Sequence, residues 1–128
     1  MAADTERETM AEEQVVLVDE HDVPTGTLGK LAAHGGGGAR HRAVSVMLFR
    51  ADGAVLLQRR ALAKYHSPGL WSNTCCGHPR PGEAPIDAAR RRLADELGID
   101  APLAFATAFE YRAALDDGLV EHEIDHVF

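Results

Sequence analysis

Apolar residues recur at steps of three and four in the middle of the chain, which is the period of one face of an α-helix. The positions with this spacing are Ile86, Ala89, Leu93 and Leu97. Pro85 suits the first turn of a helix, and Gly98 suits the position just after its end. The pattern therefore predicts a helix that begins at Pro85, ends before Gly98 and buries its apolar face.

The N-terminal half contains short apolar runs separated by turn residues. Residues 14–19 are rich in Val and predict a strand, which is followed by turn residues through Pro24-Thr25-Gly26. Residues 27–34 predict a short helix, because the four glycines at 35–38 would end a longer one. The same glycines also suit a flexible loop.

Two further apolar runs lie before the central helix. The runs at 43–49 and 54–59 flank the turn residues Ala51-Asp52-Gly53, which favours a β-hairpin. A strand is then predicted to end at 71–74, before a Gly/Pro turn at 76–79.

After the helix, residues 103–112 and 119–127 predict two strands joined through Asp116-Asp117-Gly118. Alternation in the second strand places acids on one face and apolar residues on the other. The acidic face contains Glu121, Glu123 and Asp125, and the apolar face contains Val120, Ile124 and Phe128. Because the sequence stops inside this buried strand, we expect a C-terminal part of the fold to be missing.

Composition adds a domain count and excludes some partners. The chain has 128 residues, 45% hydrophobic and 26% charged, as expected for one globular domain. Residues 1–12 are polar and acidic, which predicts a disordered tail before a single domain at 13–128. The net charge of −7 argues against binding to nucleic acid or anionic membranes. No apolar run resembles a membrane span or a signal peptide, which favours a cytoplasmic protein.

Two adjacent cysteines are the first candidates for chemistry. Cys75 and Cys76 are the only cysteines, which argues against a structural disulfide within the chain and favours reduced thiols. Cys76 lies in a Gly/Pro turn near His78, a setting that suits an exposed and acidified thiol, although a cysteine taken alone is more often a small buried hydrophobic residue. Cys75 fits a small buried hydrophobic residue better.

Nitrogen and oxygen donors on separate segments form a candidate metal site. They are His34, His41, His78, Glu121 and Glu123. Such a set suits Mn²⁺, Zn²⁺ or Mg²⁺ better than a thiolate-rich structural zinc site does. No local spacing rule joins them, and each histidine taken alone also fits a surface or capping role. The two acids lie on the same side of their strand, which favours a ligand or a proton carrier.

Other residues have structural interpretations as well as functional ones. The basic residues Arg59, Arg60 and Lys64 follow a predicted strand and fit a solvated surface. Trp71 and Tyr111 are of types found more often in cores than in sites.

The region around the predicted helix carries a spaced set of residues: Gly77, Glu83, Arg91, Leu93, Glu96, Gly98 and Ile99. This set resembles the Nudix box, a loop–helix motif that holds Mg²⁺ against a diphosphate in Nudix hydrolases. Arg92 and Asp95 stand where the box has glutamates. A guanidinium cannot ligate a cation, so the usual route of hydrolysis is disfavoured. Arg92 and Glu96, one turn apart, also fit a surface ion pair.

Several stretches carry a wider resemblance: PTGTLGKLAAH (24–34), His41, LLQRRALAKY (56–65), PGLWSNTCCGHPRPGE (68–83), RRLADELGI (91–99) and EYRAALDDGLVEHE (110–123). Together they resemble the type 1 isopentenyl-diphosphate delta-isomerases, a Nudix-fold family of isoprenoid biosynthesis. The resemblance covers nearly everything from Gln14 onward. It implies an α/β fold in which a mixed β-sheet is sandwiched by helices, without the C-terminal part of the family fold.

The resemblance also implies roles for individual residues. Cys76 matches the family's catalytic cysteine, Glu123 its catalytic glutamate and Tyr111 a tyrosine close to that glutamate. The metal ligands would be His34, His41, His78, Glu121 and Glu123, with Glu96 holding Mg²⁺ beside the diphosphate. The basic contacts to the diphosphate would be Lys30, Arg60 and Lys64.

The implied reaction interconverts isopentenyl and dimethylallyl diphosphate, with Mg²⁺ on the diphosphate and Mn²⁺, Zn²⁺ or Mg²⁺ in the His/Glu site. Our hypothesis makes Glu123, assisted by Tyr111 and the metal, the acid toward dimethylallyl diphosphate, and Cys76 thiolate the base. Two alternatives are a Nudix hydrolase of a nucleoside diphosphate derivative and a catalytically silent Nudix-fold binding module. The expected partner is a small prenyl diphosphate, bound by a monomer.

Overall fold

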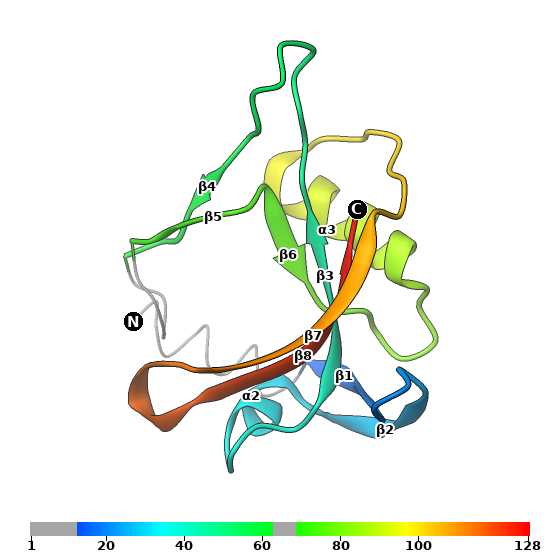
Figure 1. The fold of residues 1–128 in the computed structure, drawn as a ribbon, viewed down its shortest axis with the longest axis vertical. Helices are drawn as coiled ribbons and strands as arrows, with labels where there is room; N and C mark the ends of the chain where they lie inside the picture. Colours follow the sequence, from blue (N-terminus) through cyan, green and yellow to red (C-terminus); the bar gives the residue numbers. More distant parts are fainter. Residues whose placement is uncertain (1–12, 63–68) are drawn as a thin grey trace.

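The computed structural model describes residues 13–62 and 69–128, which form a main β-sheet, a two-stranded sheet and two α-helices. The main sheet has six strands in the order β2-β1-β3-β8-β7, and β6 also pairs with β3 (Figure 1). The bounds of these strands are β1 Gln14–Val18, β2 Pro24–Gly29, β3 His41–Val46, β6 Cys75–Gly77, β7 Thr107–Ala114 and β8 Val120–Val127.

Strand β3 organises this sheet because three strands pair along it. It runs parallel to β8 along one edge. On the other edge, β1 pairs antiparallel with its first residue, His41, and β6 pairs antiparallel with residues 44–46. The combination of parallel and antiparallel pairs confirms the predicted mixed sheet.

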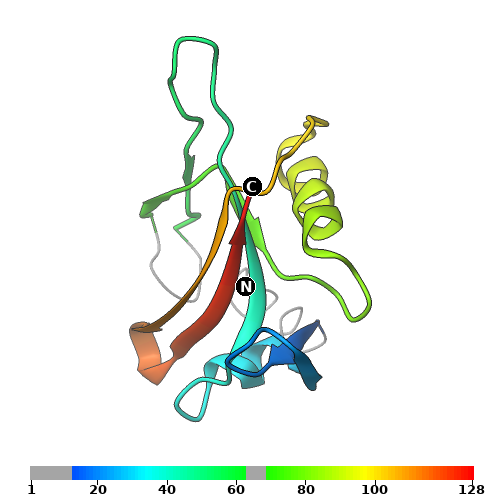
Figure 2. The same cartoon turned by 45° about the vertical axis from the view of Figure 1, so that its right-hand side comes forward.

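Helix α3, Pro85–Leu97, packs against one face of the sheet (Figure 2). Pro85 lies in the first turn, and Gly98 adopts a left-handed φ of 65° just after the helix, as the sequence predicts. The core between helix and sheet consists of Val44, Val46, Cys75, Ala88, Ala89, Leu93 and Phe128.

The predicted buried face of α3 is wrong for one residue. Ile86 is 37% exposed, whereas Ala88 is fully buried. The small side chains of Ala88 and Ala89 let the first turns of α3 approach the sheet closely, and Ile86 lies at the rim of that contact beside Leu103. Leu93 is buried and Leu97 is partly buried, as predicted.

The predicted hairpin between 43–49 and 54–59 forms only in part. Beyond the end of β3, one isolated bridge joins Phe49 to Val55 around the predicted turn. The returning chain then leaves the main sheet, and β4, Gln58–Arg59, pairs with β5, Trp71–Ser72. The prediction fails because β6 and β8 occupy the two edges of β3, so the returning run has no ladder to join. The segment between β3 and β4 therefore projects from the main sheet (Figure 1).

The segment before the glycines was also predicted incorrectly in part. Residues 24–29 form β2, paired antiparallel with β1, where the sequence suggested a turn and then a helix. Pairing with β1 satisfies the backbone groups of this segment, which a helix of so few residues could not do as well. Helix α2 is confined to Lys30–His34, and Gly36, Gly37 and Gly38 follow with positive φ.

The two strands after α3 confirm the predicted alternation. In β8, Ile124 packs into one apolar cluster, while Glu123 and Asp125 lie on the opposite face. Strand β7 begins at Thr107 rather than 103, because Leu103 packs against the α3 core instead. Cys76 and Gly77 lie in β6, where a turn was predicted.

Two predictions fall outside the described residues: the disordered tail at 1–12 and the role of Lys64. Within the ranges that the structure describes, the helices are too short and too polar to cross a membrane.

Candidate functional site

The face of the main sheet that turns away from α3 gathers polar side chains from four strands. His41 of β3 and Tyr111 of β7 both lie directly opposite Glu123 of β8. Ser45 of β3 lies opposite Cys76 of β6. Because residues opposite each other in a ladder project to the same face, the register of the strands brings these groups together.

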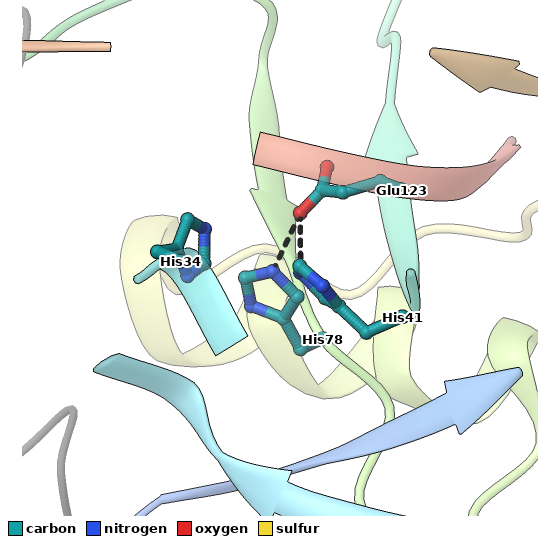
Figure 3. A group of neighbouring side chains, drawn as sticks. All are labelled: His34, His41, His78 and Glu123. Atoms are coloured by element: carbon teal, nitrogen blue, oxygen red, sulfur yellow. Dashed lines mark hydrogen bonds and ion pairs between the residues drawn. The ribbon is translucent and has the colours of Figure 1, made fainter. Parts of the chain in front are cut away.

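Three imidazoles and one carboxylate converge on this face, beside the end of α2 (Figure 3). His34 comes from the end of α2, His41 from the start of β3, His78 from the residue after β6 and Glu123 from β8. One ligand atom from each lies within 4.8 Å of the others, and the group is buried. The glycine loop between α2 and β3 is what lets His34 and His41 approach, with ring centroids 5.1 Å apart.

Backbone carbonyls orient two of these rings. His34 Nδ1 donates to the carbonyl of Lys30 at 2.8 Å, and His41 Nδ1 donates to the carbonyl of Ala39 at 2.8 Å. A carbonyl only accepts, so both Nδ1 atoms carry hydrogen and each Nε2 is turned toward the cluster. Histidines that bind metals are commonly held by such a second hydrogen bond.

Glu123 is the centre of the cluster. Its Oε2 lies 3.0 Å from His41 Nε2 and 2.9 Å from His78 Nε2. Although burial opposes ionisation, these hydrogen bonds hold the pKa of Glu123 well below its usual value. Burial also works against a charged His41, but the carboxylate raises the pKa of that imidazole.

The other two histidines are held neutral. Burial lowers the pKa of both His34 and His78. His78 Nε2 then donates to Glu123, and its buried Nδ1 has no partner among the described residues. A buried nitrogen lone pair that accepts no hydrogen bond is energetically costly. This nitrogen is therefore still able to bind a ligand or an ion.

The donor set fits a divalent cation. Three imidazoles and one carboxylate could hold a divalent metal ion, and deprotonation of His41 would free its Nε2 for binding. A bound cation would also replace the proton shared between His41 and Glu123. Glu121 lines the adjoining cavity but its carboxylate is outside this group of four.

Above the cluster lies an open cavity of about 460 Å³. Cys76, Tyr111, Glu121 and Glu123, all predicted from the sequence, line it together. The apolar part of the wall comes from Leu70, Trp71, Phe109 and Leu115. The residue type of Trp71 suggested a core position. Trp71 is instead 66% exposed and lies in the cavity wall.

A second cavity, of about 170 Å³, adjoins the first. Arg60 and Cys76 line both cavities, and Glu96 lines the second. The predicted thiol therefore lies between the sheet cluster and the helix carboxylate. Cys75 is buried, as predicted.

The thiol of Cys76 is exposed as predicted, but it is not acidified. Crowding by surrounding protein atoms and the nearby carboxylates, first Glu96 and then Glu123, raise its pKa to about 11. The Gly/Pro turn suggested a more open thiol, whereas β6 packs Cys76 among carboxylates that disfavour a second negative charge. At neutral pH the thiol holds its proton.

Tyr111 connects the cavity to the cluster. Its hydroxyl donates to Glu123 Oε1 at 2.5 Å. Burial and then Glu123 raise the pKa of Tyr111, so the phenol stays protonated. Burial and then the charge of Glu123 raise the pKa of Glu121 to about 7. The cavity thus contains several groups able to hold or release a proton, all on the same face of the sheet.

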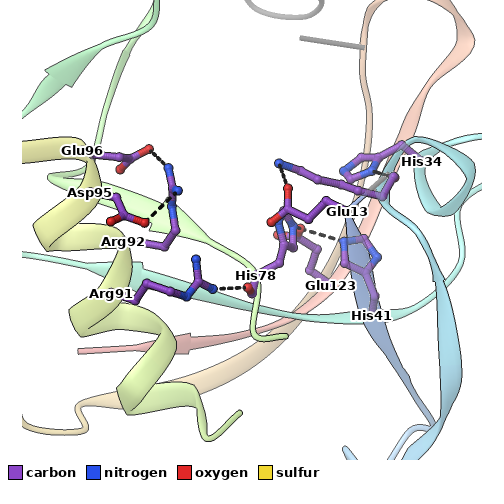
Figure 4. Close-up of polar contacts among 10 residues, drawn as sticks. Glu13, His34, His41, His78, Arg91, Arg92, Asp95, Glu96 and Glu123 are labelled. Carbon is purple, nitrogen blue, oxygen red and sulfur yellow. Dashed lines mark hydrogen bonds and ion pairs between the residues drawn. The ribbon is translucent and has the colours of Figure 1, made fainter. Parts of the chain in front are cut away.

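The carboxylates of the Nudix-box segment are engaged differently (Figure 4). Arg91 forms a two-pronged pair with Glu83, at 3.0 and 2.9 Å, and donates to the carbonyl of His78 at 3.1 Å. Arg92 pairs with Glu96 at 2.8 Å and lies 3.8 Å from Asp95. The predicted surface pair of Arg92 and Glu96 is therefore present. In this pair, Arg92 binds the carboxylate of Glu96, which the family resemblance assigns to Mg²⁺.

Lys30 lies near the cluster rather than in the cavity. Its Nζ is 3.6 Å from Glu13, and its charge reaches His78. Sequence reasoning gave no role to the cavity residues Ser45, Phe109 and Asp125, although alternation in β8 had already placed Asp125 on the face of Glu123. Phe109 lies two residues before Tyr111 on the cavity face of β7, so the same alternation would have found it.

The fold and the loop–helix segment define a class. The family model described as the NUDIX domain matches residues 39–128, and the chain belongs to this family. The chain is also similar to curated proteins with one shared name. It is 58% identical over 117 residues to "Isopentenyl-diphosphate Delta-isomerase 2" of Aromatoleum aromaticum, covering 91% of the chain and 61% of that relative. It is 52% identical over 115 residues to "Isopentenyl-diphosphate Delta-isomerase" of Pectobacterium atrosepticum, covering 90% of the chain and 64% of that relative.

The chain therefore spans about three-fifths to two-thirds of the length of these relatives. Among solved structures it resembles DR0079 from Deinococcus radiodurans, with a TM-score of 0.61 and 22% identity. That match covers 91% of this chain and 72% of the other, and it supports the fold alone.

Proposed function

We propose that this protein interconverts isopentenyl diphosphate and dimethylallyl diphosphate. The observation that carries the proposal is the presence of Cys76 and the Glu123–Tyr111 pair in the wall of one cavity, above a buried group of metal ligands. The names of the curated relatives support the same substrates.

The reaction explains why these residue types are needed. Moving the double bond requires a proton to be added at one carbon and another to be removed two carbons away. Protonation of an alkene produces a tertiary cation, so water must be excluded and negative or π charge must lie nearby. An acid and a base in one cavity meet the first requirement, and the aromatic wall of Trp71 and Phe109 helps with the second.

The resting charges support a direction for the proton transfer opposite to our sequence hypothesis. Cys76 holds its proton, since its pKa is about 11, while the pKa of Glu123 is far below neutral. Toward dimethylallyl diphosphate, Cys76 therefore acts as the acid and the Glu123 carboxylate, hydrogen-bonded to Tyr111, as the base. The two groups exchange roles in the reverse direction, because the reaction is reversible.

The second cavity is suited to the diphosphate. Arg60 lines both cavities and Glu96 lines the second, so an anion and its Mg²⁺ would lie beside Cys76. Lys30 and Lys64 are the further basic contacts in this proposal. A divalent metal on His34, His41, His78 and Glu123, with Glu121 beside it, would supply positive charge that stabilises the ionised Glu123. Binding of the diphosphate positions an alkene that has no polar group of its own.

The structure gives no comparable support to hydrolysis. Arg92 stands in place of a Nudix-box glutamate and pairs with Glu96 and Asp95, so these carboxylates are neutralised by a guanidinium. We place the protein in the cytoplasm as a monomer, with no nucleic-acid or membrane partner.

NMR of isopentenyl diphosphate in D₂O, with Mg²⁺ and with Mn²⁺, tests the proposal on the full-length protein. We expect deuterium in the prenyl chain and no phosphate release. Cys76→Ala should lower turnover by about 10³-fold or more, as expected when a proton-transfer group is removed. Phosphate release that tolerates this substitution would instead identify a hydrolase, and intact ligand without exchange would identify a binding module.

A further inference from the structure

Asp125 is a buried carboxylate that the reaction proposed above does not use. It is 6% exposed, it lies on the same face of β8 as Glu123, and it lines the larger cavity. Ser45 Oγ donates to its Oδ2 at 2.7 Å. Its Oδ1 is buried and accepts no hydrogen bond from any described residue. Buried carboxylate oxygens nearly always have partners, so this one requires an explanation.

The contrast with Glu123 shows what is unusual about Asp125. Glu123 Oε2 accepts from His41 and His78, and its Oε1 accepts from Tyr111. Both oxygens of Glu123 are therefore committed to partners. Of the two buried acids that line the cavity, Asp125 alone has an oxygen without one in the described part of the chain.

The neighbours of Asp125 across the sheet are apolar. Ala43 of β3 and Phe109 of β7 lie directly opposite it in the two ladders, and both line the same cavity. Once a hydrocarbon displaces water from these apolar neighbours, the field of the buried carboxylate is weakly screened. The face of the Phe109 ring also attracts cations. This part of the cavity therefore suits a group that is apolar at rest and carries positive charge for a short time.

We propose that Asp125 is the fixed counter-charge for the positive charge that develops on the branched hydrocarbon of the prenyl diphosphate. This inference rests on the proposed function. Ser45 acts as a positioning residue, because its hydrogen bond to Oδ2 holds the carboxylate in place before the charge appears. No bond forms to Asp125, which stabilises the cation through space.

Two diphosphate ligands separate charge from shape. In one, a tertiary ammonium replaces the carbon that becomes cationic, and the other is the neutral saturated five-carbon diphosphate. The full-length protein with its metals should bind the ammonium ligand more tightly. Asp125→Asn, which keeps the size of the side chain, should weaken that ligand by about tenfold or more and leave the saturated ligand unchanged. Asp100→Asn removes an equal charge from an exposed position and should change neither.

The outcomes are distinct. Wild-type protein that binds neither ligand would overturn the proposed function, and this inference with it. Equal binding of both ligands by the wild type, or an equal loss of both in Asp125→Asn, would overturn the inference alone. If circular dichroism shows that Asp125→Asn does not fold, Asp125→Ser removes the charge with a smaller side chain and is judged by the same criterion. In turnover, the loss should appear in kcat with KM unchanged, a split that a merely structural role would not produce.

Discussion

Two sets of carboxylates lie in this small domain, and their partners differ (Figure 4). On α3 and the loop before it, Glu83 and Glu96 pair with the guanidinium groups of Arg91 and Arg92. On β8, Glu123 pairs with imidazoles and a phenol. A guanidinium stays protonated and cannot bind a metal, whereas an imidazole can lose its proton and can bind a metal. The partner, more than the carboxylate itself, therefore sets which chemistry each set of carboxylates can take part in.

Burial adds to this difference. Glu123 is 3% exposed, while the α3 pairs are partly open to solvent. Arg91 lowers the pKa of Glu83, so that carboxylate stays ionised as half of an ion pair. Burial raises the pKa of Glu121 to about 7, so that group can change its charge near neutral pH. The same residue type is therefore fixed in one region and titratable in the other.

The largest expected contrast is between Glu123→Gln and Glu83→Gln. Glu123→Gln removes a group that the proposed function uses for proton transfer, so it should lower turnover by about 10³-fold or more. Glu83→Gln should lower turnover only a few-fold, since it weakens the Arg91 contact that also holds the carbonyl of His78. Its main effect should be a stability loss of about 0.5–1 kcal/mol. Turnover and thermal melting measure both, and similar turnover in the two variants would contradict the comparison.

A second contrast concerns metal binding. His34→Gln removes a donor from the buried cluster and should weaken Mn²⁺ or Zn²⁺ binding by more than about 100-fold, a loss larger than that from removing an outer partner. Isothermal titration with each metal, without substrate, gives the affinity. His21→Gln serves as a control, because His21 is exposed and lies outside the cluster. Equal affinity in wild type and His34→Gln would show that the cluster is not a metal site.

The third prediction concerns the stability cost of a buried acid. Burial and then Glu123 act to raise the pKa of Asp125 from 3.8 to about 6, with Ser45 opposing. Between these pH values the folded protein binds more protons than the unfolded chain, so the free energy of unfolding falls as pH rises through this window. Asp125→Asn should therefore be more stable than wild type above pH 6, by up to about 3 kcal/mol, and should gain nothing below pH 4. Urea unfolding across this pH range measures the difference.

If Asp125→Asn and the wild type have the same free energy of unfolding at every pH, burial of Asp125 does not destabilise the folded protein. The extra stability predicted for Asp125→Asn above pH 6 is stability that the wild type lacks because it keeps a charge in the cavity. The same substitution is expected to reduce binding of a cationic ligand.

The sequence predicted elements whose pattern is local. Pro85 and Gly98 marked the ends of α3, and alternation in β8 placed Glu121 and Glu123 on one face. It did not predict the path of residues 54–59, because which strand occupies the edges of β3 depends on the whole sheet. Strand β2 was missed for the same reason, since its Thr-Gly-rich sequence forms a strand only beside β1.

The site was predictable in its membership but not in its charges. The resemblance to a family named His34, His41 and His78, and the structure places the three rings together. Spacing alone could not join them, because three elements and a glycine loop must fold first. The raised pKa of Cys76 depends on Glu96 and Glu123, which lie 20 and 47 residues away in the sequence. Long-range packing of this kind leaves no local signal in the sequence.

The smallest expected effect also tests how far the pair with Arg92 weakens Mg²⁺ binding at Glu96 of α3. A Cβ at Gly77 would lie 2.5 Å from Arg92 Cγ, so the Arg92 side chain crosses β6 at its glycine and reaches Glu96 from there. Arg92→Gln should remove an ion pair worth about 0.3–0.5 kcal/mol and shift the melting temperature only slightly. It should also release Glu96, so that Mg²⁺ binds a few-fold more tightly in the presence of pyrophosphate. Arg90→Gln, which loses only the exposed Asp100 contact, is the matched control and should leave Mg²⁺ binding unchanged. If Arg92→Gln also left Mg²⁺ binding unchanged, the pair with Glu96 would be a surface contact without influence on the cation, and the difference between the two sets of carboxylates would rest on burial alone.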